Sequence, residues 1–130
     1  MTEQERIELL KQLVKTENLS GIRTEISDFN DDKKTHAKFY SADGGLWYPL
    51  YLTNDVESYT DGIPCFMMLD AMEKAGYRYV ICSPGKLSNS SENYFQFIVY
   101  SKGGHSMTKG HCTIQEAISR TFVAVFGQEE

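Results

Sequence analysis

Apolar residues recur at helical spacing in three stretches of the chain. Ile7 and Leu10 belong to the apolar face of a helix that we predict over residues 3–17. A second helix is predicted over residues 62–75 and a third over residues 113–127, because apolar positions repeat there every three or four residues. Such amphipathic helices need a sheet or other helices to cover their apolar faces.

A residue suited to capping precedes each predicted helix. Thr2 and Thr113 each stand three residues before a glutamate, the spacing of a capping box in which hydroxyl and carboxylate both accept backbone N–H groups. Asp61 is the candidate N-cap of the middle helix, and Pro64 fits its first turn because no intrahelical hydrogen bond is lost there. We therefore expect local side chains to define all three helix starts.

The stretches between the helices have the composition of strands and turns. Residues 22–40 alternate at both ends around an acidic turn and are predicted to form a hairpin. Residues 77–83 and 94–101 are rich in strand-favouring residues. Residues 83–93 are polar and predict a loop, and the glycine-rich residues 102–111 predict a turn leading into a short edge strand.

Residues 46–52 form the aromatic run Leu-Trp-Tyr-Pro-Leu-Tyr-Leu. Pro49 disfavours a central strand because proline cannot donate to a sheet ladder, so we predict an extended, packed loop. Trp47, Tyr48 and Tyr51 either complete the core of a thin sheet or form an exposed patch that binds a partner. The pattern leaves both interpretations open.

The chain has 130 residues, of which 41% are hydrophobic and 24% charged, as in ordinary globular proteins. We predict one α+β domain over residues 1–130, with a small antiparallel sheet packed against about three helices. The expected order is helix–hairpin–helix–strand–strand–helix. The chain contains no run of about 18 apolar residues, so no membrane span is predicted. Its acidic start is unlike a secretory signal, and the cytoplasm is therefore the expected location.

The negative charge is concentrated in the first half of the chain. Residues 1–65 carry 12 acidic and seven basic side chains, whereas residues 66–130 carry six of each. Binding to duplex nucleic acid is not expected, because it needs a large basic surface. The acidic half either increases solubility or faces a partner, and its candidate partner-binding carboxylates are Asp28, Asp31 and Asp32.

Metal-binding and catalytic patterns are incomplete. Residues 28–39 begin like an EF-hand loop, but Lys33 stands where glycine makes the sharp turn and Phe39 where glutamate closes the site. No nucleophile–base pair or paired carboxylates are visible, so we expect no metal and no cofactor and lean against an enzyme. The residues that come nearest to a zinc site match no standard spacing; they are His36, His105, His111 and Cys112.

A glycine-rich loop before the third helix is the candidate site for a small anion. Its cations precede a helix start, where free backbone N–H groups and the helix dipole favour negative charge. The alternative function is therefore a protein that binds or sequesters an anion or a nucleotide. The residues involved would be Lys102, His105, Lys109, His111 and Thr113.

Two segments carry short motifs that resemble a known family. Residues 113–120 (Thr-Ile-Gln-Glu-Ala-Ile-Ser-Arg) and residues 49–55, which lead into a helix, together resemble the phage ABA sandwich domain family of small phage proteins. The resemblance covers residues 46–126, although Gln115 stands where the family often has proline. It implies a phage or prophage origin, a helix–strand–strand–helix core and the host cytoplasm, and it brings no catalytic residues.

The expected function is that of a non-enzymatic phage or prophage accessory protein that binds a host or phage protein. Inhibition of a bacterial defence system is one concrete version of this hypothesis. Self-association, through residues 94–101 or through the aromatic run, stays open alongside it.

Overall fold

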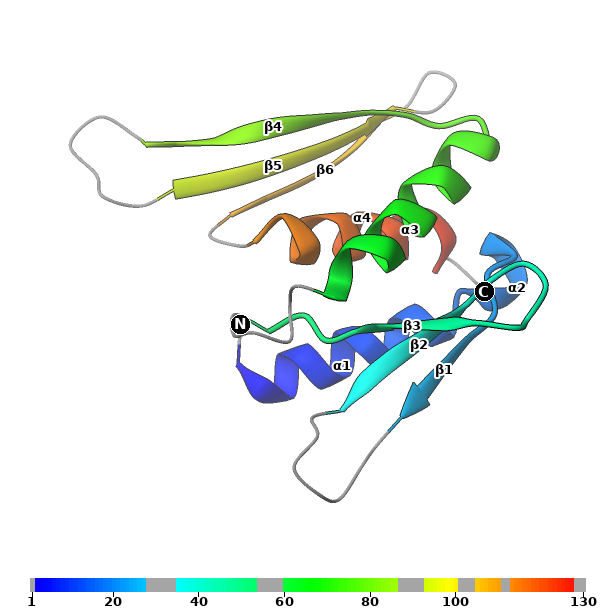
Figure 1. The fold of residues 1–130 in the computed structure, drawn as a ribbon. Coiled ribbons are helices and arrows are strands. Elements are labelled where there is room, and N and C mark those ends of the chain that lie inside the picture. Colours follow the sequence, from blue (N-terminus) through cyan, green and yellow to red (C-terminus); the bar gives the residue numbers. More distant parts are fainter. Residues whose placement is uncertain are drawn as a thin grey trace.

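The computed structural model describes residues 2–27, 35–53, 60–86, 93–100, 105–110 and 113–127, with the backbone alone for residues 80–86, 93–100 and 105–110. Within these residues the predicted α+β class is confirmed. The strands form two antiparallel sheets of three, where the sequence predicted one small sheet, and two helices lie between the sheets (Figure 1).

The N-terminal sheet contains β1 (Thr24–Ser27), β2 (His36–Tyr40) and β3 (Trp47–Leu50), in that order. β1 and β2 pair antiparallel, which confirms the hairpin predicted over residues 22–40. The extended loop predicted at residues 46–52 is wrong at its centre, because β3 pairs with β2. Pro49 is accommodated because β3 is an edge strand, where one side of the backbone has no ladder partner.

The C-terminal sheet contains β4 (Arg78–Lys86), β5 (Asn93–Tyr100) and β6 (His105–Gly110), with β5 in the centre. β4 continues past residue 83, so the predicted loop over residues 83–93 is wrong for its first residues. The register shifts between Cys82 and Gly85, as at a bulge, which lets the strand continue through Pro84. β6 confirms the short edge strand expected within residues 102–111.

The helices are α1 (Glu3–Val14), α2 (Glu17–Ser20), α3 (Gly62–Lys74) and α4 (Ile114–Phe126). α3 and α4 lie within one residue of their predicted bounds, but the helix predicted over residues 3–17 ends early. The buried Thr16 hydroxyl donates to the Leu13 carbonyl at 2.7 Å, and the chain turns there before the short α2 begins. Gly21, with φ of 79°, then ends α2 in the left-handed conformation that glycine favours.

The predicted capping box is confirmed at Thr2. At Thr113 only its hydroxyl half is formed, because the Glu116 carboxylate accepts from Arg120. The Thr2 hydroxyl accepts the N–H of Glu5 at 3.1 Å, and the Glu5 carboxylate accepts the N–H of Thr2 at 2.8 Å. The Thr113 hydroxyl accepts the N–H of Glu116 at 3.2 Å. These bonds satisfy backbone N–H groups that have no partner inside the helix.

Asp61 precedes α3 as predicted, but its side chain does not cap the helix. Its buried carboxylate instead accepts the backbone N–H groups of Tyr51 at 2.8 Å and Leu52 at 3.0 Å. Leu52 has a φ of 59°, which is costly for a side chain of this size. Asp61 therefore fixes the segment that leaves β3.

Arg6 holds the same segment from α1. Its Nη1 donates to the carbonyl of Tyr51 at 2.6 Å and to the carbonyl of Thr35 at 2.8 Å. Its Nη2 lies 2.6 Å from the carboxylate of Glu3, so the buried guanidinium has a charged partner. The backbone of Tyr51 is thus bound to Asp61 through its N–H and to Arg6 through its carbonyl.

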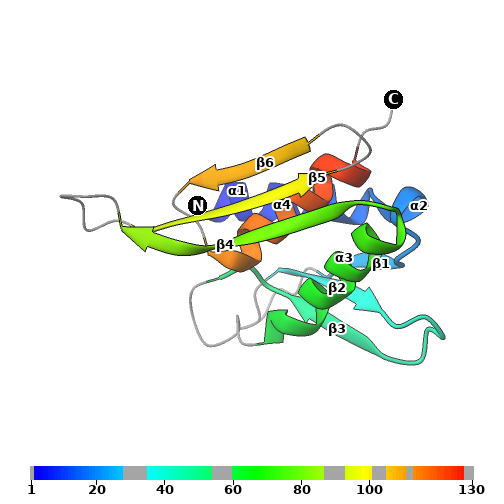
Figure 2. The same ribbon diagram turned by 90° about the horizontal axis from the view of Figure 1, so that it is seen from above.

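The layers are connected mainly through the helices. α1 packs on β1, β2 and α4; α3 packs on β3, β4 and α4; and α4 packs on β5 and β6 (Figures 1 and 2). None of the described helices is both long and apolar enough to cross a membrane. The described core contains Leu9, Leu10, Leu13, Ala37, Phe39, Leu50, Leu52, Cys65, Met68, Met72, Ala117, Ile118, Phe122 and Phe126.

Candidate binding surfaces

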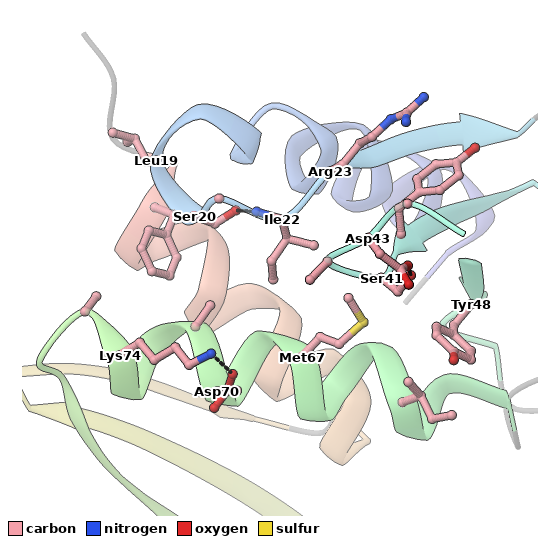
Figure 3. A pocket seen from close by; sticks show the side chains of 18 residues that line it. Leu19, Ser20, Ile22, Arg23, Ser41, Asp43, Tyr48, Met67, Asp70 and Lys74 are labelled. Carbon is pink, nitrogen blue, oxygen red and sulfur yellow. Dashed lines mark hydrogen bonds and ion pairs between the residues drawn. The ribbon is translucent and has the colours of Figure 1, made fainter. Parts of the chain in front are cut away.

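A groove runs between α3 and the two segments that face it, α2 and the turn joining β2 to β3 (Figure 3). Its volume is about 900 Å³, near the upper end of the range of small-ligand sites. Ile22 and Met67 point into it from opposite walls, and Tyr48 lines one end. Phe126 of α4 also lines it, so apolar side chains from several elements meet in the groove beside polar ones.

Large apolar side chains remain exposed around this groove. Leu19 of α2 and Ile63 of α3 line it and are 58% and 49% exposed. Phe66, three residues after Ile63 on α3, is 75% exposed. We call the groove and these three residues the groove surface; Leu19 and Ile63 line the groove, and Phe66 extends the exposed apolar area along α3.

The turn between β2 and β3, which forms one wall of the groove, is stabilised by hydrogen bonds within the turn. The Asp43 carboxylate accepts the Ser41 hydroxyl at 2.6 Å and the N–H of Gly45 at 2.8 Å. These two bonds, the first above all, hold the pKa of Asp43 below its ordinary value. Gly44 takes a φ of 76°, a left-handed conformation that closes the turn.

Charged groups lie along the margin of the groove. On α3, the Lys74 ammonium lies 3.0 Å from the Asp70 carboxylate, and both side chains are mostly exposed. Arg23 lies on the opposite side, at the end of the segment after α2 (Figure 3). The groove is therefore lined by apolar and charged side chains together.

The face of the N-terminal sheet that points away from the core forms a second surface. In β2, Ala37 and Phe39 are buried in the core, so Lys38 and Tyr40 lie on the other face. Trp47 pairs directly with Tyr40 and is 45% exposed. We call the surface of Arg23, Lys38, Tyr40 and Trp47 the aromatic face.

Two cations lie against the rings of the aromatic face. The Lys38 ammonium lies 4.6 Å from the centre of the Trp47 ring, and the Arg23 guanidinium carbon lies 4.4 Å from the centre of the Tyr40 ring. The Tyr40 hydroxyl donates to Glu25 at 2.8 Å, and this bond is the main cause of the raised pKa of Tyr40. These contacts fix the Tyr40 and Trp47 rings relative to the two cations.

Trp47, Tyr48 and Tyr51 differ in exposure, and none of them belongs to the described core. Trp47 is exposed on the aromatic face, and Tyr48 is half-buried at the groove. Tyr51 is half-buried with its ring 4.8 Å from the buried His36 ring, which also stacks on Trp47 at 6.2 Å. The interpretation of these residues as a partner-binding patch stays a prediction.

The loop predicted to bind a small anion is only partly described. Lys102 and His111 lie outside the described residues, and His105 and Lys109 stand in β6 opposite Tyr100 and Gln96. The hydroxyl of Thr113 accepts the Glu116 N–H within its own helix. The acidic partner-binding residues Asp28, Asp31 and Asp32 also lie outside the described residues.

No group of three metal-ligating side chains occurs within the described part of the chain. Cys65 is buried, and burial, with the charge of Asp61 as a smaller cause, raises the pKa of its thiol to about 12. A thiol with so high a pKa is a poor nucleophile at neutral pH, because the reactive form is the thiolate.

Sequence reasoning missed the groove surface. Its walls come from segments near residues 20, 43 and 67, which only the fold brings together. One indication was present: Ile63 and Phe66 lie off the apolar stripe of Cys65, Met68 and Met72 that buries α3.

Comparison with known proteins gives no further support for either surface. No family model, no curated protein and no solved structure matches this chain. The resemblance to the phage ABA sandwich domain family therefore stays a prediction, and the two surfaces must be interpreted from their own geometry.

Proposed function

We propose that this protein is a non-enzymatic phage or prophage accessory protein that binds a host or phage protein through the groove surface. One observation carries the proposal: Leu19 and Ile63 line the groove with apolar area that stays exposed, and Phe66, three residues after Ile63 on the same helix, is exposed as well. Exposed apolar area of this kind is typical of protein interaction sites.

The exposed residues on α3 favour a partner segment that lies along the helix. Ile63, Phe66 and Met67 follow the i, i+3, i+4 spacing that presents apolar side chains on one side of a helix. Burying a side chain as large as Phe66 is worth about 1.5–3 kcal/mol. An amphipathic segment of the partner would cover these residues, and Asp70 and Lys74 would orient its polar side.

The concrete version of this function is inhibition of a bacterial defence system. The small size of the chain, the acidic charge of residues 1–65 and the resemblance to phage proteins support it. The partner would then be a host protein, and expression of this chain in a host that carries the defence system would restore plating of a restricted phage.

The proposal is tested with the full tagged chain and two matched variants. Ile63→Asp places a charge in the groove surface, whereas Leu46→Asp places it on a residue 61% exposed that does not line the groove. We expect the wild type and Leu46→Asp to capture the same host protein in a complex of defined mass. Ile63→Asp should weaken that complex at least about tenfold, because a carboxylate would be buried without a partner.

Equal capture by both variants would exclude the groove surface as the interface. Capture of no defined partner by the wild type would count against a protein-binding function altogether.

A further inference from the structure

The aromatic face combines flat rings with cations in a way that the groove surface does not. Tyr40 and Trp47 are direct neighbours across β2 and β3, so their side chains lie side by side. A cation lies within 5 Å of the centre of each ring. We propose that this face binds single-stranded nucleic acid, with bases stacked on the rings and phosphates beside Arg23 and Lys38.

The Trp47 ring is suited to stacking because it is both exposed and supported. Nearly half of its surface is open, at 45%. The buried His36 ring lies 18° from parallel to it, and Tyr51 packs on His36 in turn. A ring held in this way loses little conformational entropy when a base stacks on it, which favours binding.

The local charge favours an anionic ligand although the chain as a whole is acidic. Arg23 and Lys38 are opposed on this face by Glu25, whose carboxylate accepts the Tyr40 hydroxyl at 2.8 Å. The balance of these residues is positive, in a chain of net charge −5. Two cations suit a few phosphates of a single strand, and they are too few for the broad basic surface that duplex binding requires.

The aromatic face adjoins the groove surface, because Arg23 and Tyr40 also line the groove. Trp47 and Lys38 do not line the groove, and Ile63 and Phe66 do not belong to the aromatic face. Variants at these four unshared residues therefore serve as controls for the other surface, and the two proposals fail separately.

Trp47 is the only tryptophan in the chain, so intrinsic tryptophan fluorescence reports on this face alone. The full chain would be titrated at low salt with labelled oligouridine and oligothymidine of about ten nucleotides, within the site sizes of single-strand binders. We expect quenching of Trp47 and a saturable rise in oligonucleotide anisotropy. Comparison of the two oligonucleotides shows whether RNA or DNA is preferred.

Substitutions separate stacking from charge. Trp47→Ala should lower affinity at least about tenfold and Trp47→Phe much less, because stacking on an aromatic ring supplies much of the binding. Phe66→Ala, which removes an exposed ring outside this face, should leave affinity unchanged. With two phosphate contacts, log K should fall with log[NaCl] at a slope near −1.4, and Lys38→Gln should bring the slope to about −0.7.

Three outcomes would overturn the proposal. The first is no binding of either oligonucleotide at low salt. The second is equal affinity of wild type and Trp47→Ala, or equal quenching by inorganic polyphosphate, which has charge but no bases. The third is loss of protein-partner capture on Trp47→Ala with no oligonucleotide binding, which would assign this face to a protein interface.

Discussion

Two aspartates at opposite ends of β3 form the same kind of bond in different surroundings. Asp43, in the turn before the strand, accepts the Ser41 hydroxyl and the Gly45 N–H while exposed to solvent. Asp61 accepts two backbone N–H groups just after the strand and is wholly buried. Water can replace Asp43 as an acceptor, but it cannot reach the groups that Asp61 serves.

The difference shows how β3 can be fixed at one end and open at the other. The buried end, where Arg6 and Asp61 meet the backbone of Tyr51, joins the sheet to α1 and α3. The exposed end forms a wall of the groove, and the bonds that Asp43 accepts there come from its own turn. Stability and binding are therefore expected to depend on different ends of the same strand.

The largest effect is expected at the buried end. Asp61→Ala leaves the N–H groups of Tyr51 and Leu52 without their acceptors, and we expect the free energy of unfolding to fall by about 3 kcal/mol. Asp61→Asn keeps one acceptor oxygen and should lose less. Urea unfolding monitored by circular dichroism measures both, and a loss for Asp61→Ala as small as that for a surface residue would contradict the comparison.

Arg6→Met should have the next largest effect. It keeps most of the apolar stem but removes the guanidinium that donates to the carbonyls of Thr35 and Tyr51, and we expect a loss of about 2 kcal/mol. Combined with Asp61→Ala, the losses should not add, because both side chains hold Tyr51. Glu8→Gln, at an exposed residue of α1, is the control and should cost little.

Burial of Cys65, with the charge of Asp61 as a smaller cause, makes stability depend on pH. The folded pKa of Cys65 is raised from 9.0 to about 12, so the folded protein disfavours the thiolate. This contribution to stability is complete below pH 9 and is lost as the pH rises toward 12. The urea midpoint of the wild type should therefore fall more steeply above pH 9 than that of Cys65→Ala; parallel curves would contradict this.

The smallest effect is expected at Asp43. Its folded pKa is lowered from 3.8, so its contribution is present above that pH and is lost as the pH falls through the folded pKa. Asp43→Ala should change the urea midpoint at pH 7 least of these variants. On acidification, the urea midpoint of Asp43→Ala should begin to fall at the same pH as that of the wild type, but the fall should be slightly smaller. If Asp43→Ala destabilised the protein as much as Asp61→Ala, the expected difference between the exposed and the buried aspartate would be wrong.

Local patterns predicted the helices well and the strands in part. Thr2 and Thr113 cap their helices because a cap involves only the first turn. Asp61 has the same local context, yet its carboxylate serves a segment ten residues earlier, which no local pattern shows. Pro49 correctly excluded a central strand, but sequence could not show that an edge position was available.

The candidate surfaces were less predictable than the fold. Trp47 was identified as a surface candidate, but its relation to Lys38 depends on the register of β2 and β3. The groove depends on three segments meeting in space. Its only trace in the sequence was the presence of Ile63 and Phe66 outside the buried stripe of α3.

The position of α4 has a consequence for how the chain folds during synthesis. This helix packs against α1, α3, β5 and β6, and it follows all of them in the sequence. Each sheet joins strands that are neighbours along the chain, so both can begin to form as they leave the ribosome. The apolar surfaces that α4 covers stay open to chaperones until it emerges, and a pause in translation before residue 114 would prolong that exposure.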